Sequence, residues 1–489
     1  MILDAERDIE HYDAEVSQLR SRILYLQAKQ RVLKTHIRQL QSLSAPVRRL
    51  PVEVITHIFM LACRDIPVRL DSPPSLGWNP PFTLASVCKS WRQIVIGTPQ
   101  LWCNVQIETN EASCLPQARL CLARSGSFPL SLEIDTKEDS LFDLLIEECN
   151  RWRRFCIHES EPAFLAKLAG NSFPLLEELS IDHTENGHPD LDLFCRAPRL
   201  HTLKTDSLPP KEELLDFPFG QILNLDLLCN TEDNLIFTAL AMFPELQSVI
   251  IQDLDSDWLS GVSSRHVSRL SELVIGMPWV PPASPVKNVL GILMKGLTLP
   301  SLKVLSISHE KSSPSIWPRE EIISLFERSK CSLTTLHLDH ISVPHSDIIT
   351  FLQLNPALTE LRLKEIRRKL FDFRTYKMGD GNVFRFADVI SPALLTALHA
   401  YKCGMDSLSS PLVPKLERLE FVADGDLFDD RLFLDMVVSR WIPEKDYALA
   451  IGVTSLWSVK ITVLGRAIQE EVKSELEHLR KAGLKVTVG

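Results

Sequence analysis

The sequence predicts a mixed α/β protein in three parts: a long N-terminal helix at 1–43, a small helical module at 45–107, and an irregular array of repeated strand units at 108–489. Three observations predict it. The first forty residues carry an apolar heptad pattern, a string of apolar and tryptophan residues at helical spacing follows, and the pattern L-x-x-L-x-L then returns to the end of the chain. A chain of 489 residues is also too long for one ordinary compact core.

Bulk composition narrows the class of protein. Hydrophobic residues make up 45% and charged residues 24% of the chain, which is typical of a folded protein rather than a disordered one. The net charge of −10 argues against general binding of nucleic acid, because an acidic surface repels phosphates. No signal peptide or transmembrane run is visible, and the 11 cysteines form no C-x-x-C pair. We therefore expect a cytoplasmic or nuclear protein without contact to a membrane.

Residues 1–43 repeat apolar side chains with a period of 3.5 residues. Eleven of the twelve a and d positions from Ile2 to Leu40 are apolar or aromatic, without proline or glycine between them. This pattern predicts a left-handed coiled coil, and branched residues at a with leucine at d favour a parallel dimer. The partner helix belongs either to a second copy of this chain or to another chain, and a long amphipathic helix folded back on its own chain is the alternative. The predicted seam consists of Ile9, Val16, Leu19, Ile23, Leu26, Leu33, Ile37 and Leu40.

Residues 45–107 predict a small helical module. Pro51 stands where a helix can begin, because the first helical position does not use its N–H group. A broad apolar stripe follows in Val54, Ile55, Ile58, Phe59 and Ala62. After a proline-rich loop, Thr83 can cap a second helix that ends at Gly97. Its expected buried face consists of Leu84, Val87, Cys88, Trp91, Ile94 and Val95.

The order Leu50-Pro51-Val52-Glu53-Val54-Ile55, Ile58-Phe59, Cys88-Lys89-Ser90-Trp91 and Leu101-Trp102 resembles the F-box of fungal F-box proteins. One departure is the connection from Cys63 to Phe82, which is longer than is usual in that family. The resemblance implies docking on a Skp-type adaptor of a cullin ubiquitin ligase through Leu50, Pro51, Ile55, Ile58, Phe59, Leu84, Val87 and Cys88. It also implies that Trp91, Leu101 and Trp102 hold the module together. An unrelated helical subdomain with these residues as its core is the alternative.

The rest of the chain repeats a strand-like unit. L-x-x-L-x-L units begin at Leu176, Leu200, Ile222, Leu246, Leu270, Leu302, Leu333, Leu358, Leu395 and Leu416, with variants at Trp152 and Leu456. The first five starts are 24, 22, 24 and 24 residues apart. Proline stands two residues before six of the ten starts, although 31 prolines in 489 residues give only about 0.6 by chance. These six are Pro174, Pro198, Pro244, Pro300, Pro356 and Pro414.

Each unit resembles a degenerate leucine-rich repeat, which implies a horseshoe-shaped solenoid with inward leucines. The amphipathic stretch from Leu464 to Leu479 is expected to cap its end, and ordinary α/β packing of independent domains is the alternative. In such strands the residues between the leucines face the concave surface. We therefore predict that a protein target binds there, through His337, Asp339, Arg362, Lys364, His399 and Tyr401.

Chemical motifs are missing from the sequence. The groups His183, Glu185, His188 and Asp190, and His337, Asp339, His340 and His345, lack zinc-ligand spacing, and Leu297 occupies the lysine position of a phosphate loop. The basic run Arg367-Arg368-Lys369, with Arg374 and Lys377, is interpreted as a solvated insertion, or alternatively as a nuclear-localisation signal or a site for an anionic partner. We expect no metal, cofactor or enzymatic activity. The predicted function is a substrate-recognition subunit of a Skp–cullin–F-box ubiquitin ligase; a coiled-coil scaffold or protein-binding repeat module outside ubiquitin ligation is the alternative.

Overall fold

The computed structural model describes residues 2–43, 45–71, 79–108, 114–158, 165–181, 190–209, 216–227, 236–254, 266–278, 288–309, 316–366, 387–401 and 411–489. The chain forms two compact units. The helical unit comprises Met1–Val68, Leu76–Asn104 and Leu122–Gly126, and the sheet unit comprises Arg69–Ser75, Val105–Cys121 and Ser127–Gly489. The predicted module at 45–107 therefore contributes residues to both units.

The predicted N-terminal helix is confirmed, because α1 runs from Ile2 to Leu43 without a break. The remaining described helices of this unit are short. A 3₁₀ turn at Pro46–Arg49 leads into α2 (Val52–Cys63), and α3 (Pro80–Val87) and α4 (Lys89–Ile96) are followed by a 3₁₀ turn at Pro99–Trp102.

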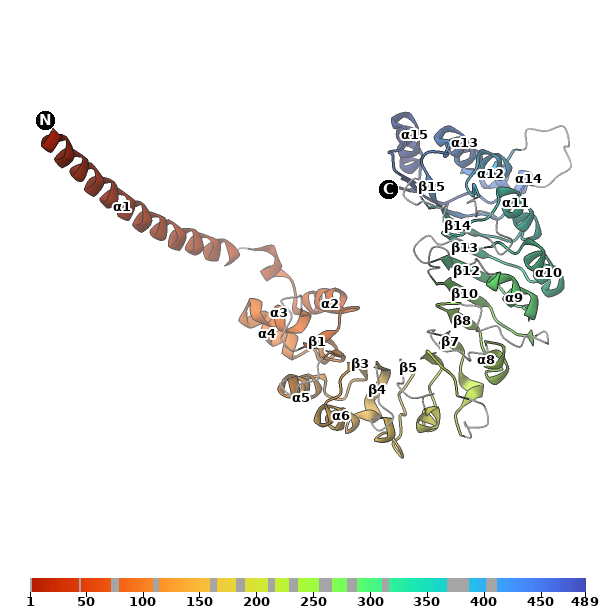
Figure 1. Ribbon diagram of the computed structural model, residues 1–489, viewed down its shortest axis with the longest axis horizontal. Coiled ribbons are helices and arrows are strands. Elements are labelled where there is room, and N and C mark those ends of the chain that lie inside the picture. Colours follow the sequence, from red (N-terminus) through yellow and green to blue (C-terminus); the bar gives the residue numbers. More distant parts are fainter. Residues whose placement is uncertain are drawn as a thin grey trace. The chain divides into compact units, whose positions relative to one another are not determined.

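The mixed α/β class is confirmed by one large sheet, whose fifteen strands are paired in the order in which they follow along the chain, skipping β9 and β11 (Figure 1). From β3 onward every neighbouring pair is parallel. The strands are β1 (Val68–Asp71), β2 (Asn104–Glu108), β3 (Leu130–Asp135), β4 (Trp152–Ile157), β5 (Glu178–Ile181), β6 (Thr202–Thr205), β7 (Asn224–Leu227), β8 (Ser248–Ile251), β10 (Glu272–Met277), β12 (Val304–His309), β13 (Thr335–Asp339), β14 (Glu360–Lys364), β15 (Arg418–Asp424), β16 (Ser458–Leu464) and β17 (Lys485–Val488). A separate two-stranded sheet pairs β9 (His266–Val267) with β11 (Leu297–Thr298).

Helices lie between the strands. They are α5 (Leu115–Ser125), α6 (Asp139–Ile146), α8 (Ile236–Met242), α9 (Val289–Gly296), α10 (Arg319–Ser329), α11 (His345–Leu354), α12 (Pro392–Leu398), α13 (Asp430–Arg440), α14 (Lys445–Ile451) and α15 (Glu470–Lys481). Figure 1 shows α8, α9, α10 and α11 along one face of the sheet. The core lies between this helical layer and the strands, where side chains such as Leu203, Leu336 and Leu361 are fully buried. No helix in the described part of the chain has the length and apolar character needed to cross a bilayer.

The repeated prolines have a clear structural role. In each of the six units, the leucine that starts the unit donates its N–H to the carbonyl three residues earlier, at 3.1–3.4 Å. Proline is the second residue of that turn, where its fixed φ angle is favourable. The residue after the starting leucine then bonds to its counterpart in the preceding unit, as Glu177 N–H does to the Arg153 carbonyl at 2.8 Å. This backbone ladder brings successive units into register.

One predicted strand unit is wrong. Residues 395–400 were expected to form a strand, but Leu395 lies in α12. Ser391 accepts a hydrogen bond from the backbone N–H of Leu394, and Pro392 occupies the first turn, so the segment carries a helix start signal. As a result β14 pairs directly with β15, with Glu360 opposite Arg418.

The sheet also extends beyond the predicted units. Strands β1, β2, β3 and β17 were not predicted, and β17 follows the expected terminal cap. The cap itself is present as α15, which buries Val472 and Leu476.

Candidate interaction surfaces

The core of the helical unit is built around its tryptophans. Trp102 is completely buried, and its indole Nε1 donates a hydrogen bond to the Val95 carbonyl at 2.9 Å. Phe82 contacts it edge-on at 5.3 Å between ring centroids, and the Arg124 guanidinium lies over its ring at 4.4 Å. Each of these contacts joins segments that are distant in sequence. Trp91 packs edge-on against Phe59 of α2, with centroids 4.8 Å apart, and Leu101 is buried beside Trp102 in the following turn.

The residues predicted to contact an adaptor separate into two groups. Ile55, Phe59 and Leu84 are buried inside the chain, so their side chains stabilise the fold and present no free surface. For these three, direct contact with a partner is not supported by the structure. Cys88 also has a local role, because its sulfur caps α4 by accepting the N–H of Trp91 at 3.4 Å. The exposed members are Leu50, Pro51, Ile58 and Val87.

A row of exposed apolar side chains runs along the other face of α2. Val54, Ile58 and Leu61 lie four and three residues apart and are 43%, 45% and 58% exposed. We call these three residues the α2 row. The buried residues Ile55 and Phe59 lie on a different face of the same helix. Only one of the two apolar faces of this helix is buried within the chain. Because large exposed apolar patches mark interaction sites, the α2 row is a candidate surface for a partner.

The predicted coiled-coil seam is also unpartnered. All eight seam residues are exposed on α1, from Ile9 to Leu40. Nothing in the described part of the chain covers them, although such a run of apolar side chains is favourable only when buried.

The open face of the sheet carries a set of ion pairs. In β13–β16 buried apolar residues, which are leucines in β13 and β14, alternate with more exposed residues, and polar members of the exposed set pair across strands. Glu360 accepts from His337 at 3.1 Å and from Arg418 at 2.6 Å, and Glu420 binds Lys460 at 2.9 Å. The predicted target-binding residues His337, Asp339, Arg362 and Lys364 are therefore gathered on one face.

Asp339 is a buried charge of this face, at 8% exposed. Arg362 binds both of its carboxylate oxygens, with Nε 2.9 Å from Oδ1, and Lys364 Nζ lies 3.0 Å from Oδ2. Burial alone raises the pKa of this carboxyl, but the bonds from Arg362 and Lys364 outweigh it and lower the pKa below 3.8. The same contact raises the pKa of Arg362.

The other two predicted target-binding residues do not join this face. His399 and Tyr401 follow α12 instead of a strand, where His399 Nδ1 lies 2.8 Å from the Tyr401 carbonyl. The Tyr401 hydroxyl meets that of Tyr447, in α14, at 3.2 Å. Placing them on the sheet was wrong, because the segment before them is a helix.

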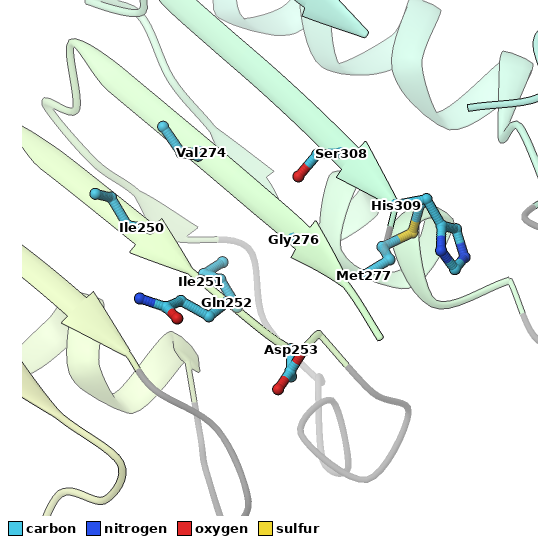
Figure 2. Close-up of a pocket in the computed structure, with 9 residues that line it drawn as sticks. All are labelled: Ile250, Ile251, Gln252, Asp253, Val274, Gly276, Met277, Ser308 and His309. Atoms are coloured by element: carbon cyan, nitrogen blue, oxygen red, sulfur yellow. The ribbon is translucent and has the colours of Figure 1, made fainter. Parts of the chain in front are cut away.

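A shallow pocket that the sequence did not indicate lies further along the same face. It measures about 480 Å³ and is lined by Ile250, Ile251, Gln252, Asp253, Val274, Gly276, Met277, Ser308 and His309. Figure 2 shows Ile250, Val274 and Ser308 on three adjacent strands, with Gln252, Asp253, Met277 and His309 at the strand ends. Gly276 is required there, because a Cβ atom would lie 2.5 Å from the Gln252 carbonyl oxygen.

The structure supports none of the candidate metal-binding or phosphate-binding groups among its described residues. Among the described residues no group of three or more histidine, cysteine, aspartate or glutamate side chains is arranged to hold a metal. Gly291 and Gly296 lie within α9. His183, Glu185 and His188, and the basic run Arg367-Arg368-Lys369, lie outside the described residues.

A scan against models of known protein families finds no match to this chain, and no curated protein matches it either. Its function is therefore inferred from its residues and their geometry.

Proposed function

We propose that the chain is a substrate receptor of a Skp–cullin–F-box ubiquitin ligase, in which the helical unit docks on a Skp-type adaptor. The observation that carries this proposal is the α2 row, an exposed apolar stripe on a helix whose other face is already packed. The row follows Leu50 and Pro51, the positions at which the sequence resembles an F-box. Burial of a valine, leucine or isoleucine side chain contributes about 1.5–3 kcal/mol, so three half-exposed side chains can anchor a stable contact.

The sheet unit would hold the target. We interpret its sequential parallel strands, inward leucines and turn prolines as a leucine-rich-repeat-like solenoid, with the open face as its binding surface. The ion-paired strands β13–β16 support this interpretation, because the charged groups there are fixed in place before a partner arrives. The proposed role requires no catalytic group on this chain.

The test of adaptor docking places negative charges on the exposed row. Full-length protein carrying Val54→Glu and Ile58→Glu should lose capture by a purified Skp-type adaptor, with affinity falling by about a hundredfold or more, because two apolar anchors would be replaced by desolvated carboxylates. Both side chains point to solvent, so circular dichroism and the melting temperature should stay unchanged.

Leu449→Glu is the matched control. Leu449 is 80% exposed on α14 in the sheet unit, so the same chemical change there should leave adaptor capture intact. Undiminished capture by a folded double variant would refute docking through α2 and favour a role outside ubiquitin ligation.

We also infer that α1 pairs with α1 of a second copy. The exposed seam, its heptad spacing and its branched a positions support a parallel two-stranded coiled coil. Leu26→Glu should convert a dimer into a monomer in sedimentation at micromolar concentration, whereas Gln27→Glu, outside the seam, should not. A monomeric wild-type chain would refute this pairing.

A further inference from the structure

Three side chains that the sequence analysis did not connect lie together on the open face of the sheet, in β3 and β4. Cys156 lies opposite Glu133 in the strand register, and His158 follows two residues later. The Cys156 sulfur is 3.3 Å from Nε2 of His158, and the same Nε2 is 3.5 Å from Oε1 of Glu133. All three side chains are partly exposed, so small molecules can reach the sulfur.

Neighbouring contacts hold this group in place. Gln106 Nε2 donates to Oε1 of Glu133 at 3.0 Å and to Oε1 of Glu108 at 2.8 Å. Arg69 on β1 in turn binds Glu108 at 3.0 Å. The backbone N–H of His158 donates to the Ile134 carbonyl at 2.9 Å, which ties the residue after β4 to β3. The imidazole and the carboxylate are thus oriented before any reaction.

This geometry places a base beside the sulfur. His158 can take the thiol proton directly, and the thiolate is the nucleophilic form of cysteine. The Glu133 carboxylate stabilises the imidazolium, while its own charge opposes the thiolate. Among the other charged groups nearby, Arg154 donates to Oγ of Ser131 at 3.2 Å, and Glu178 on β5 is paired with Lys204 on β6 at 3.1 Å.

We propose that Cys156 is a site of oxidation by hydroperoxides, with His158 as the proton donor. The sulfur attacks the terminal oxygen of the peroxide, so that an S–O bond forms while the O–O bond breaks. The leaving alkoxide takes the proton from Nε2 of His158 and departs as an alcohol, or as water when the oxidant is hydrogen peroxide. The sulfur is oxidised by two electrons to a sulfenic acid, and the peroxide is reduced.

The test compares two cysteines within the same molecule. Full-length protein is treated with hydrogen peroxide at pH 7 in the presence of a cyclic 1,3-diketone that traps sulfenic acids, and labelled peptides are quantified by mass spectrometry. Cys195 is exposed and serves as the internal control. Cys156 should be labelled about tenfold faster than Cys195, because its thiol has a base within hydrogen-bond distance.

Two variants separate activation from proton donation. His158→Gln should slow labelling of Cys156 by about tenfold and leave Cys195 unchanged, and Glu133→Gln should produce a smaller loss. Alkylation by iodoacetamide needs the thiolate but no protonated oxygen leaving group, so His158→Gln should slow it less than it slows oxidation.

Equal labelling of the two cysteines in the wild-type chain would overturn the proposal, whether or not the variants fold. Equal losses of alkylation and oxidation in His158→Gln would overturn the role of His158 as proton donor. This inference does not depend on adaptor docking.

Discussion

Replacing Asp339 with alanine tests the ion pairs of the open face most directly. The substitution leaves Arg362 and Lys364, whose side chains are 29% and 24% exposed, without their shared carboxylate. Each hydrogen bond to a charged group contributes about 1.5–3 kcal/mol when buried. Since both cations can regain part of their hydration, the total falls well below the sum of three such bonds. We expect Asp339→Ala to lower local stability by about 2–3 kcal/mol.

A double-mutant cycle isolates the pair itself. Arg362→Ala alone should cost about 1–2 kcal/mol, and the double variant Asp339→Ala, Arg362→Ala should be more stable than the sum of the single effects by about 1–2 kcal/mol. Arg431 and Glu475 form an ion pair of ordinary length, 3.1 Å, but are 61% and 48% exposed, so their cycle is the control and should give less than about 0.5 kcal/mol.

Hydrogen exchange of amides in β13–β15 is the suitable measurement. A chain with two compact units need not unfold in one step, and exchange reports the opening free energy of these strands separately. Additive effects at Asp339 and Arg362, equal to those of the control cycle, would refute the reasoning.

The stability that Asp339 contributes should depend on pH with a definite sign. The pKa of folded Asp339 is lowered, so its contribution is complete above the unfolded pKa of about 3.9 and is lost as pH falls through the folded pKa. The gap between the wild type and Asp339→Asn should therefore narrow in acid.

Three further substitutions have expected outcomes. Arg440 is fully buried, its pKa is lowered to about 10 by burial, and its guanidinium donates to three backbone carbonyls, including that of Val413 at 3.1 Å. Arg440→Met should leave those carbonyls unpaired and lower thermal stability by about 2–4 kcal/mol, measured by calorimetry. Asp430→Asn weakens the bidentate contact with Arg466, so urea unfolding at pH 7 should need less denaturant. The contacts from Arg466 outweigh burial and lower the pKa of Asp430, so the loss of stability should shrink in acid, where the wild-type carboxylate is itself protonated. Gly276→Ala should cost about 1–3 kcal/mol in the same urea assay, since its methyl group meets the neighbouring backbone.

Sequence patterns predicted the strands because their signal is local. A leucine at the start of each unit, a proline two residues earlier and alternation within the strand all act within eight residues, and the turn at Pro198 is explained by that short window alone. The unit at Leu395 forms a helix instead of the predicted strand. A helix buries Leu394, Leu395 and Leu398 equally well, and Ser391 and Pro392 provide its start signal.

The candidate sites were harder to predict, because they depend on which face of an element is covered. Both faces of α2 are apolar, so spacing alone does not distinguish the buried Ile55 from the exposed Ile58. The spacing Cys156-x-His158 was visible as one face of a strand. The carboxylate beside it comes from Glu133, on the preceding strand, and only the register of β3 against β4 brings it there.

Because the charges on β13–β16 are already paired with one another, the proposed target would bind more favourably elsewhere on the same face. Arg362, one of the predicted target-binding residues, already satisfies Asp339, so a partner that used it would have to replace bonds that exist in the free protein. Strands β8, β10 and β12 present Ile250, Val274 and Val304 on the same face, next to the pocket of Figure 2. Apolar contact there gains the benefit of burial without displacing the Asp339–Arg362 pair. Side chains at the centre of an interface contribute most of its free energy, whereas charges at its rim mainly set orientation. Strands β8, β10 and β12 are therefore the better anchor for the proposed target, and the ion-paired strands beside them are suited to selecting which target docks.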